Sequence, residues 1–257
     1  MDKIPVIAVA FGTSTEARET YAFFEECFRT RYPETELAWA FTSRILREKV
    51  HNTSFRMNSL EDVLQRFEQQ GYKRAVVQSL HIIPGIEFEK ITDAASRSAL
   101  KTAVGMPLLS TDEDIANTLS ALADRIPETR EWATVLVGHG THHPAGKVYQ
   151  TIERILKERS QDNVLISVVE GEPRWEAARE SIKKSGAKKV KFIPLMFVAG
   201  DHMLNDVMGE DSEDGEASWK MQLPGVEVDG KEKGLGFNLK IIDIYLQHLE
   251  KARRALS

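Results

Sequence analysis

The strongest constraint on the fold comes from residues 135–144 (VLVGHGTHHP), where an apolar, mostly β-branched run ends abruptly in glycine and histidine. A short apolar run closed by turn residues predicts a buried strand. Gly138 and Gly140 lack a Cβ, so the chain can turn sharply around His139 and a bulky group can approach its ring. The pattern therefore predicts a strand that delivers an imidazole to the carboxyl edge of a sheet, where open α/β sheets place their chemistry.

Apolar runs alternate with helical patterns along the chain, which predicts an α/β fold with parallel strands in βαβ units. In the first half, strands are expected over residues 6–11 and 36–41 and again from residue 75. Helices are expected up to about residue 32, over 57–70 and around 87–103. Gly71 stands where the second of these helices should end.

The second half repeats the plan of the first. Phe11-Gly12-Thr13 corresponds to His139-Gly140-Thr141, and the stretch 71–85 resembles 186–200. The repeat predicts two similar Rossmann-like α/β domains, residues 1–127 and 128–257, although a chance match of glycines and apolar residues is the alternative. Two such domains facing each other would form a cleft between their strand ends.

Composition excludes several classes of partner. The formal net charge of −5 argues against nucleic acid and anionic membranes as partners, since both require a basic surface on the protein.

No window of eighteen apolar residues occurs, and the start of the chain has no signal-peptide pattern, so the expected location is the cytoplasm. Cys27 is the single cysteine, which excludes an intramolecular disulfide and a thiolate-rich metal site.

Three residues capable of binding a metal follow successive predicted strands: His139, Glu170 and His202. Two imidazoles and one carboxylate suit divalent first-row metals such as cobalt, iron, nickel or zinc, and they leave coordination positions open for exchange. The chain has no HExxH-type helix signature, so spacing alone leaves open a set of hydrogen-bonded loop residues instead of a metal site.

The other histidines have weaker signals. His81 follows a strand and faces either the same cleft or the core. His142 and His143 are either partners of the central motif or ordinary loop residues. Solvent exposure is expected for two histidines on polar helical stretches and for one acidic run: His51, His248 and residues 209–216.

The ordered set of motifs resembles the anaerobic sirohydrochlorin cobaltochelatases of the CbiK type, within the class II chelatases that include ferrochelatase. The matching stretches run along the whole chain. They are residues 10–14, 40–44, 79–85 with Glu87, 138–141 with 143–145, 169–171, 194–196 with 198–202, and 211–220.

The resemblance implies two chelatase-like domains with parallel sheets related by a pseudo-twofold, and a tetrapyrrole cleft between them. It also implies insertion of Co2+ into sirohydrochlorin on the anaerobic route to cobalamin, with cobalt as the substrate metal and no organic cofactor. His139, Glu170 and His202 would then bind the metal, and His139 would also accept a proton. Glu87 would face them as a carboxylate that handles protons or positions the substrate.

Sirohydrochlorin carries many carboxylates, which need hydrogen-bond donors. The candidates to bind the substrate are Thr13, Ser14, Arg44, His81 and Thr141. For Arg44 a surface salt bridge is the alternative. The sequence also leaves open iron or nickel as the metal, precorrin-2 as the substrate, a carrier that binds without turnover, and a homo-oligomer.

Overall fold

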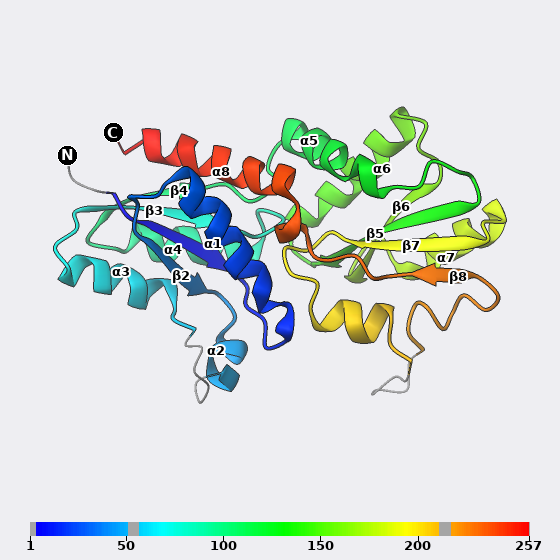
Figure 1. Ribbon diagram of the computed structural model, residues 1–257, viewed down its shortest axis with the longest axis horizontal. Helices are drawn as coiled ribbons and strands as arrows, with labels where there is room; N and C mark the ends of the chain where they lie inside the picture. The colour runs from blue at the N-terminus through cyan, green and yellow to red at the C-terminus, as the bar shows by residue number, and fades with distance from the viewer. Residues whose placement is uncertain (1–3, 51–56, 211–216, 257) are drawn as a thin grey trace. The chain divides into compact units, whose positions relative to one another are not determined.

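The chain folds into two α/β units. The first unit comprises Met1–Asp114 and Gly236–Ser257, and the second comprises Ile115–Leu235. The computed structural model (Figure 1) describes residues 4–50, 57–210 and 217–256. His51 and residues 211–216, for which the sequence predicts solvent exposure, lie outside these ranges. None of the helices in the described ranges is long and apolar enough to cross a membrane.

The first unit is built on a four-stranded parallel sheet with the order β2-β1-β3-β4. Every residue of the first strand is buried, as expected for a strand covered on both faces. The strands are β1 (Val6–Ala10), β2 (Leu37–Phe41), β3 (Arg74–Ser79) and β4 (Lys101–Gly105).

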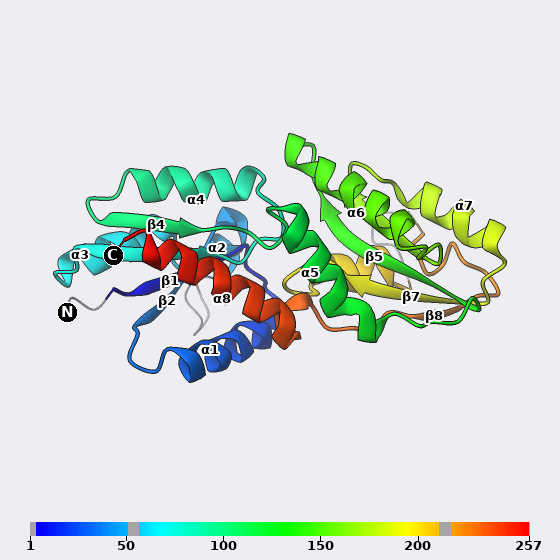
Figure 2. The ribbon, with the colours of Figure 1, turned by 90° about the horizontal axis from the view of Figure 1, so that it is seen from above.

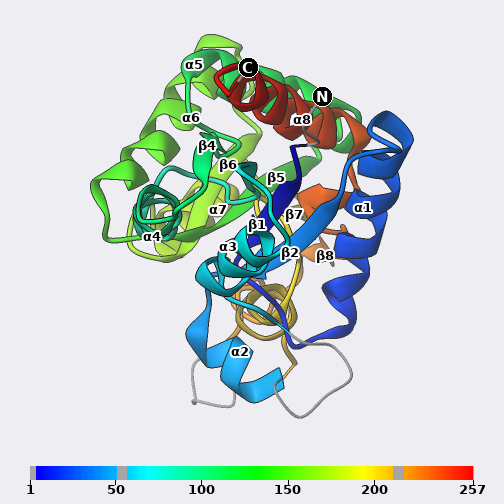
Figure 3. The ribbon, with the colours of Figure 1, turned by 90° about the vertical axis from the view of Figure 1, so that its left-hand side faces the viewer.

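Helices cover both faces of this sheet. Helices α3 and α4 pack against one another and onto the strands, while α8 packs on β3 and β4 beside α1. Figure 2 shows α4 on one side of the strands and α8 with α1 on the other, and Figure 3 shows α1 and α8 on a common side. The helical segments of this unit are η1 (Glu16–Arg18), α1 (Glu19–Arg31), α2 (Arg44–Val50), α3 (Leu60–Gln69), α4 (Ile86–Ser96), η5 (Leu235–Phe237, at the unit boundary) and α8 (Leu239–Arg254).

Local sequence explains where these helices begin and end. Ser59 and Asp62 form a reciprocal capping box at the start of α3, and Gly71 follows its end with φ +89°. Helix α1 buries the aromatic residues Tyr21, Phe24 and Phe28, which lie on one face at helical spacing.

The second unit repeats this topology, with a four-stranded parallel sheet in the order β6-β5-β7-β8. The prediction of two similar α/β domains with parallel sheets is confirmed by the identical order. Its strands are β5 (Trp132–Gly140), β6 (Val164–Glu170), β7 (Lys189–Pro194) and β8 (Glu227–Asp229). Its helical segments are α5 (Asp112–Leu122, which starts in the first unit), η2 (Ala123–Arg125), η3 (Pro144–Gly146), α6 (Lys147–Glu158), α7 (Trp175–Ser185) and the π-helical turn η4 (Met203–Val207).

Two details differ from the sequence-based expectation. The helix expected around 87–103 ends at Ser96, and residues 101–105 form β4, because the short run Thr102-Ala103-Val104 pairs with β3. The predicted boundary at 127/128 places the last helix in the second domain, whereas α8 packs on β3 and β4 of the first unit. The first unit is therefore discontinuous in sequence.

The expectation that His248 is solvated is wrong. Its side chain is 4% exposed, and it lies on the face of α8 that packs on the first sheet. Nε2 is 3.0 Å from Asp114 Oδ1, and Nδ1 is 3.0 Å from the Met106 carbonyl oxygen. Asp114 also accepts a hydrogen bond from Thr111. His248 therefore ties the last helix to the start of α5 through a buried polar pair.

Replacing His248 with alanine should strongly destabilise the protein, because the buried Asp114 carboxylate would lose the imidazole at Oδ1 and keep only the Thr111 hydroxyl at Oδ2. The expected loss is about 3–5 kcal/mol of unfolding free energy, measured by urea denaturation. Asp243→Ala is the matched control on the same helix, since it removes an exposed ion pair with Arg31, and its cost should be about 0–1 kcal/mol. Equal losses in the two variants would contradict the role of the buried pair.

Candidate functional site

Two histidines from distant parts of the chain meet in the second unit. His139 is the next-to-last residue of β5, and His202 directly precedes η4, which follows β7. Their ring centroids are 4.7 Å apart and their planes are at 88°, an edge-to-face arrangement. β5 and β7 are adjacent parallel strands, so the segments that follow them leave the same edge of the sheet.

Hydrogen bonds determine which nitrogen of each ring is protonated. His139 Nδ1 is 3.2 Å from the Gly140 carbonyl oxygen, and His202 Nδ1 is 2.6 Å from Asp206 Oδ2. A carbonyl or a carboxylate only accepts, so Nδ1 is the donor in both rings. In the neutral state each imidazole therefore carries its lone pair on Nε2, the arrangement common among metal-binding histidines.

Asp206 is a residue that the sequence reasoning missed. It lies four residues after His202, within the π-helical turn, and is exposed. Its carboxylate orients the imidazole in the way that outer carboxylates orient histidine ligands. The His-x-x-x-Asp spacing on a helical turn is the signal that could have identified it.

Glu170 ends β6, the strand next to the one that carries His139, but its side chain does not form one group with the two histidines. Its backbone pairs with Gly140 in the sheet, and its side chain is exposed. Among the described residues, no three or more His, Cys, Asp or Glu side chains lie in a metal-binding arrangement. Of the predicted set of three ligands, the structure brings together the two imidazoles.

Gly138 and Gly140, which flank His139, lie so close to other groups of the protein that neither position has room for a Cβ atom. A Cβ on Gly138 would collide with the ring of Tyr149, and a Cβ on Gly140, which has φ +87°, would collide with the Glu170 carbonyl. Tyr149 is buried on α6, and its hydroxyl accepts a hydrogen bond from the Gly140 amide at 3.3 Å. Burial raises the pKa of Tyr149 to about 12, partly opposed by that hydrogen bond, so the phenol stays neutral and holds the strand end.

The loop after β5 is held together by its own side chains. The Thr141 hydroxyl accepts a hydrogen bond from the His143 amide at 3.0 Å. His143 Nδ1 accepts from the Ala145 amide at 3.1 Å and caps η3, so it serves the loop, whereas His142 is exposed.

In the first unit, the loop after β1 and the start of α2 hold three predicted substrate-binding residues. Thr13 is buried and its hydroxyl is 2.9 Å from that of Thr15, whereas Ser14 is exposed. Arg44 is exposed and pairs with Glu48 at 2.8 Å. The surface salt bridge that the sequence left open for Arg44 is therefore present.

His81 and Glu87 belong to a polar cluster at the carboxyl edge of the first sheet. His81 follows β3, with Nδ1 3.1 Å from the Ser79 hydroxyl and Nε2 3.2 Å from the Thr42 hydroxyl. Burial lowers the pKa of the His81 imidazole to about 4, Glu87 opposes this shift and Lys90 adds to it. The ring is therefore neutral at physiological pH.

The carboxylate of Glu87 is ionised despite its partial burial. Burial raises its pKa, but hydrogen bonds from Lys90 and Thr42, with the charge of Lys90 and the influence of His81, outweigh that effect and the pKa lies below its usual value. Lys90 Nζ donates to Oε1 at 2.6 Å. Oε2 is buried and has no hydrogen-bond partner among the described residues.

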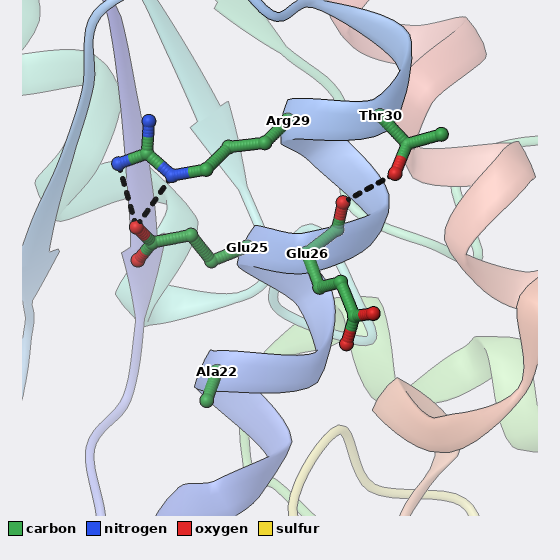
Figure 4. Close-up of a pocket in the computed structure, with 5 residues that line it drawn as sticks. All are labelled: Ala22, Glu25, Glu26, Arg29 and Thr30. Carbon is green, nitrogen blue, oxygen red and sulfur yellow. Dashed lines mark hydrogen bonds and ion pairs between the residues drawn. The ribbon is translucent and has the colours of Figure 1, made fainter.

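A surface hollow lies apart from these groups. It is lined by one helix, α1, and contains none of the predicted site residues (Figure 4). Arg29 donates to Glu25 there, and the Trp39 indole donates to the same carboxylate. Its lining residues are Ala22, Glu25, Glu26, Arg29 and Thr30.

Comparison with known proteins gives the family. The family described as "Cobalt chelatase (CbiK)" matches residues 5–254. "Sirohydrochlorin cobaltochelatase CbiKC" of Nitratidesulfovibrio vulgaris is 33% identical and is aligned over 100% of this chain and 93% of its own length. "Sirohydrochlorin cobaltochelatase" of Salmonella typhimurium is 30% identical, over 97% of this chain and 96% of its own.

A solved structure supports the fold. The structure titled "SirB from Bacillus subtilis with Fe3+" is similar with a TM-score of 0.64 at 18% identity, covering 99% of this chain and 97% of the other. With the family match spanning nearly the whole chain, this protein belongs to the cobalt chelatase (CbiK) family and is a metal chelatase.

Proposed function

We propose that this chain inserts Co2+ into sirohydrochlorin, the activity that the names of its two relatives describe for those proteins. The observation that carries the proposal is the pair His139 and His202, whose Nδ1 atoms donate hydrogen bonds while their rings lie edge to face.

The reaction needs groups that bind a cation weakly and take up protons. Two pyrrole N–H protons must leave the macrocycle while the hydrated ion loses water. A neutral imidazole can bind a divalent ion through Nε2 and can accept a proton once the ion has moved on. His139 acts in both roles in this proposal, and His202 is the second metal-binding imidazole.

Two carboxylates complete the proposal. Glu170 is the third group for the substrate metal, because its exposed side chain can rotate and its backbone is paired with Gly140, next to His139. A carboxylate there would neutralise part of the charge of the ion during transfer. Glu87, which is ionised in the first unit, is the carboxylate that handles protons or positions the substrate.

The substrate carboxylates need donors. Arg44 is exposed and is held only by a surface ion pair, which costs little to exchange for a substrate carboxylate. Ser14 is exposed, while the hydroxyls of Thr13 and Thr141 form hydrogen bonds within their own loops, so these two residues would contribute through the loop backbone.

We also propose the cytoplasm as the location, since a chain with one cysteine has no intramolecular disulfide to maintain.

His139→Ala should lower the rate of Co2+ insertion by at least about 100-fold, because it removes both a metal-binding group and the proton acceptor. The rate is measured from the change in visible absorption of sirohydrochlorin at several substrate equivalents per protein. His142→Ala, an exposed imidazole in the same loop, is the control and should retain the wild-type rate.

Wild-type turnover in His139→Ala would contradict the assignment. Metallation by the wild-type protein that stops at one equivalent would indicate a carrier instead of an enzyme. Since nitrogen and oxygen ligands discriminate poorly among first-row metals, faster insertion of Fe2+ or Ni2+ at equal free metal concentrations would replace cobalt as the substrate metal.

Asp206→Asn should weaken Co2+ binding or activity by about 10- to 100-fold, as loss of an outer carboxylate does at other histidine sites. The physical reason is that His202 loses the acceptor that holds its ring and fixes its tautomer. Titration calorimetry with Co2+ alone measures the binding.

Asp201→Asn makes the same charge change in the same turn, but Asp201 contacts Asn205 and not the imidazole, so it serves as the control. Equal effects of the two substitutions would attribute the loss to charge alone and remove Asp206 from its role.

A further inference from the structure

The chain segment that follows β8, residues 230–235, packs against the chain that leads to His202. Figure 1 shows this segment in orange. The Leu235 amide donates to the Met196 carbonyl oxygen at 2.8 Å, and the Leu235 side chain is buried. Met196 is the second residue after β7, and residues 197–201 connect it directly to His202. Contacts made by segment 230–235 therefore influence where the imidazole lies.

Gly234 is a point of very close approach between the two stretches of chain. A Cβ at this position would lie 2.5 Å from the Phe197 carbonyl oxygen and 2.6 Å from the Ala199 amide nitrogen, which is closer than Cβ atoms come to other groups. Both neighbours are backbone atoms, so they can give way only if residues 197–199 move. Since only residues 200 and 201 separate Ala199 from His202, such a movement would displace the imidazole.

Two cations hold the middle of segment 230–235 through Glu232. Lys191 Nζ is 2.8 Å from Glu232 Oε1, and Arg125 Nη1 is 3.4 Å from Oε2. The side chains of Lys191, Arg125 and Glu232 are 15%, 21% and 21% exposed, so water and salt screen these ion pairs only weakly. Lys191 belongs to β7, the strand from which the chain to His202 departs. Glu232 therefore ties segment 230–235 to the sheet itself.

Gly230, at the start of the segment, has a different kind of neighbour. A Cβ there would lie 2.2 Å from Met208 Sδ and 2.6 Å from its Cγ. These atoms belong to a flexible side chain that can rotate away, since methionine adapts readily to altered packing. Neither Gly230 nor Gly234 has a positive φ, so alanine at either position is limited by its neighbours and not by the backbone conformation. The two glycines are thus a matched pair.

We propose that Glu232 and Gly234 are positioning residues that hold His202 in its place beside His139 by fixing the backbone of residues 197–199. The inference rests on the proposed function, in which His202 binds the substrate metal. His139 lies within β5, so the 4.7 Å separation of the two rings depends on where His202 is held. Both positioning residues act through His202, and the sequence reasoning placed neither of them in the site.

The first test compares Gly234→Ala with Gly230→Ala in the full chain, by titration calorimetry with Co2+ alone. Gly234→Ala should weaken Co2+ binding by about 10-fold, the lower end of the loss seen when support of a metal-binding histidine is removed. Gly230→Ala should keep the wild-type affinity, because the Met208 side chain moves and the backbone of residues 197–199 does not. Equal Co2+ affinities in the two variants would overturn the inference.

A second measurement needs neither metal nor chelatase activity. NMR spectra of nitrogen-15-labelled histidine rings report on His202, whose signals are assigned by their loss in His202→Asn. These signals should shift in Gly234→Ala and in Glu232→Gln, which removes the charge but keeps the shape of the side chain. They should stay in place in Gly230→Ala, and the signals of the exposed His142 should stay in place in all three variants.

Glu232→Gln also separates positioning from stability and provides the test if Gly234→Ala does not fold. Urea denaturation gives the unfolding free energy of each variant, and calorimetry gives its affinity for Co2+. Glu232→Gln should weaken Co2+ binding and shift the His202 signals together. A loss of unfolding free energy with unchanged His202 signals and unchanged Co2+ affinity would show that Glu232 serves stability alone, and would overturn the inference.

The measurements separate the inference from the proposed function. If the wild-type protein fails to insert Co2+ into sirohydrochlorin but the His202 signals shift in Gly234→Ala and not in Gly230→Ala, the proposed function fails and the positioning of His202 stands. If Co2+ insertion proceeds and the two glycine variants have the same His202 signals and the same Co2+ affinity, the inference fails and the function stands.

Discussion

Parallel pairing of strands that are buried on both faces is the constraint on which the rest of the structure depends. Buried backbone groups must be hydrogen-bonded, and helices must cover both sides of the sheet, so each strand is followed by a crossover. All strands in a sheet then end at one edge, and the residues just past those ends are gathered there regardless of their separation in sequence. His139 with His202, and Thr42 with His81 and Glu87, are brought together in this way.

The two units share a topology but differ in chemistry at equivalent edges. Phe11 and Thr42 in the first unit correspond to His139 and Glu170 in the second, and the strand order is the same in both sheets. One edge therefore presents two imidazoles whose rings meet edge to face, while the other presents the Glu87 carboxylate paired with Lys90. A duplicated scaffold can divide a reaction's tasks between its halves because the loops vary while the sheet is retained.

Much of the fold could be predicted because strand burial and helix periodicity are local signals. The fold class, most strands and the approach of His139 and His202 follow from them. The missed features depend on tertiary contacts. β4 is a short run that becomes a strand by pairing with β3, and His248 looks solvated until α8 is packed onto the first sheet. Asp206 contacts the His202 ring one helical turn away, which a linear pattern does not show.

The return of α8 to the first unit has a consequence for the order of folding during synthesis. A ribosome releases the chain from its N-terminus, so residues 115–235 emerge complete before α8 does. Until then, one face of the first sheet lacks the cover that Ile241, Tyr245 and Leu249 provide. The first unit is therefore the first to begin and the last to be completed, and one face of its sheet exposes apolar side chains until α8 has been synthesised.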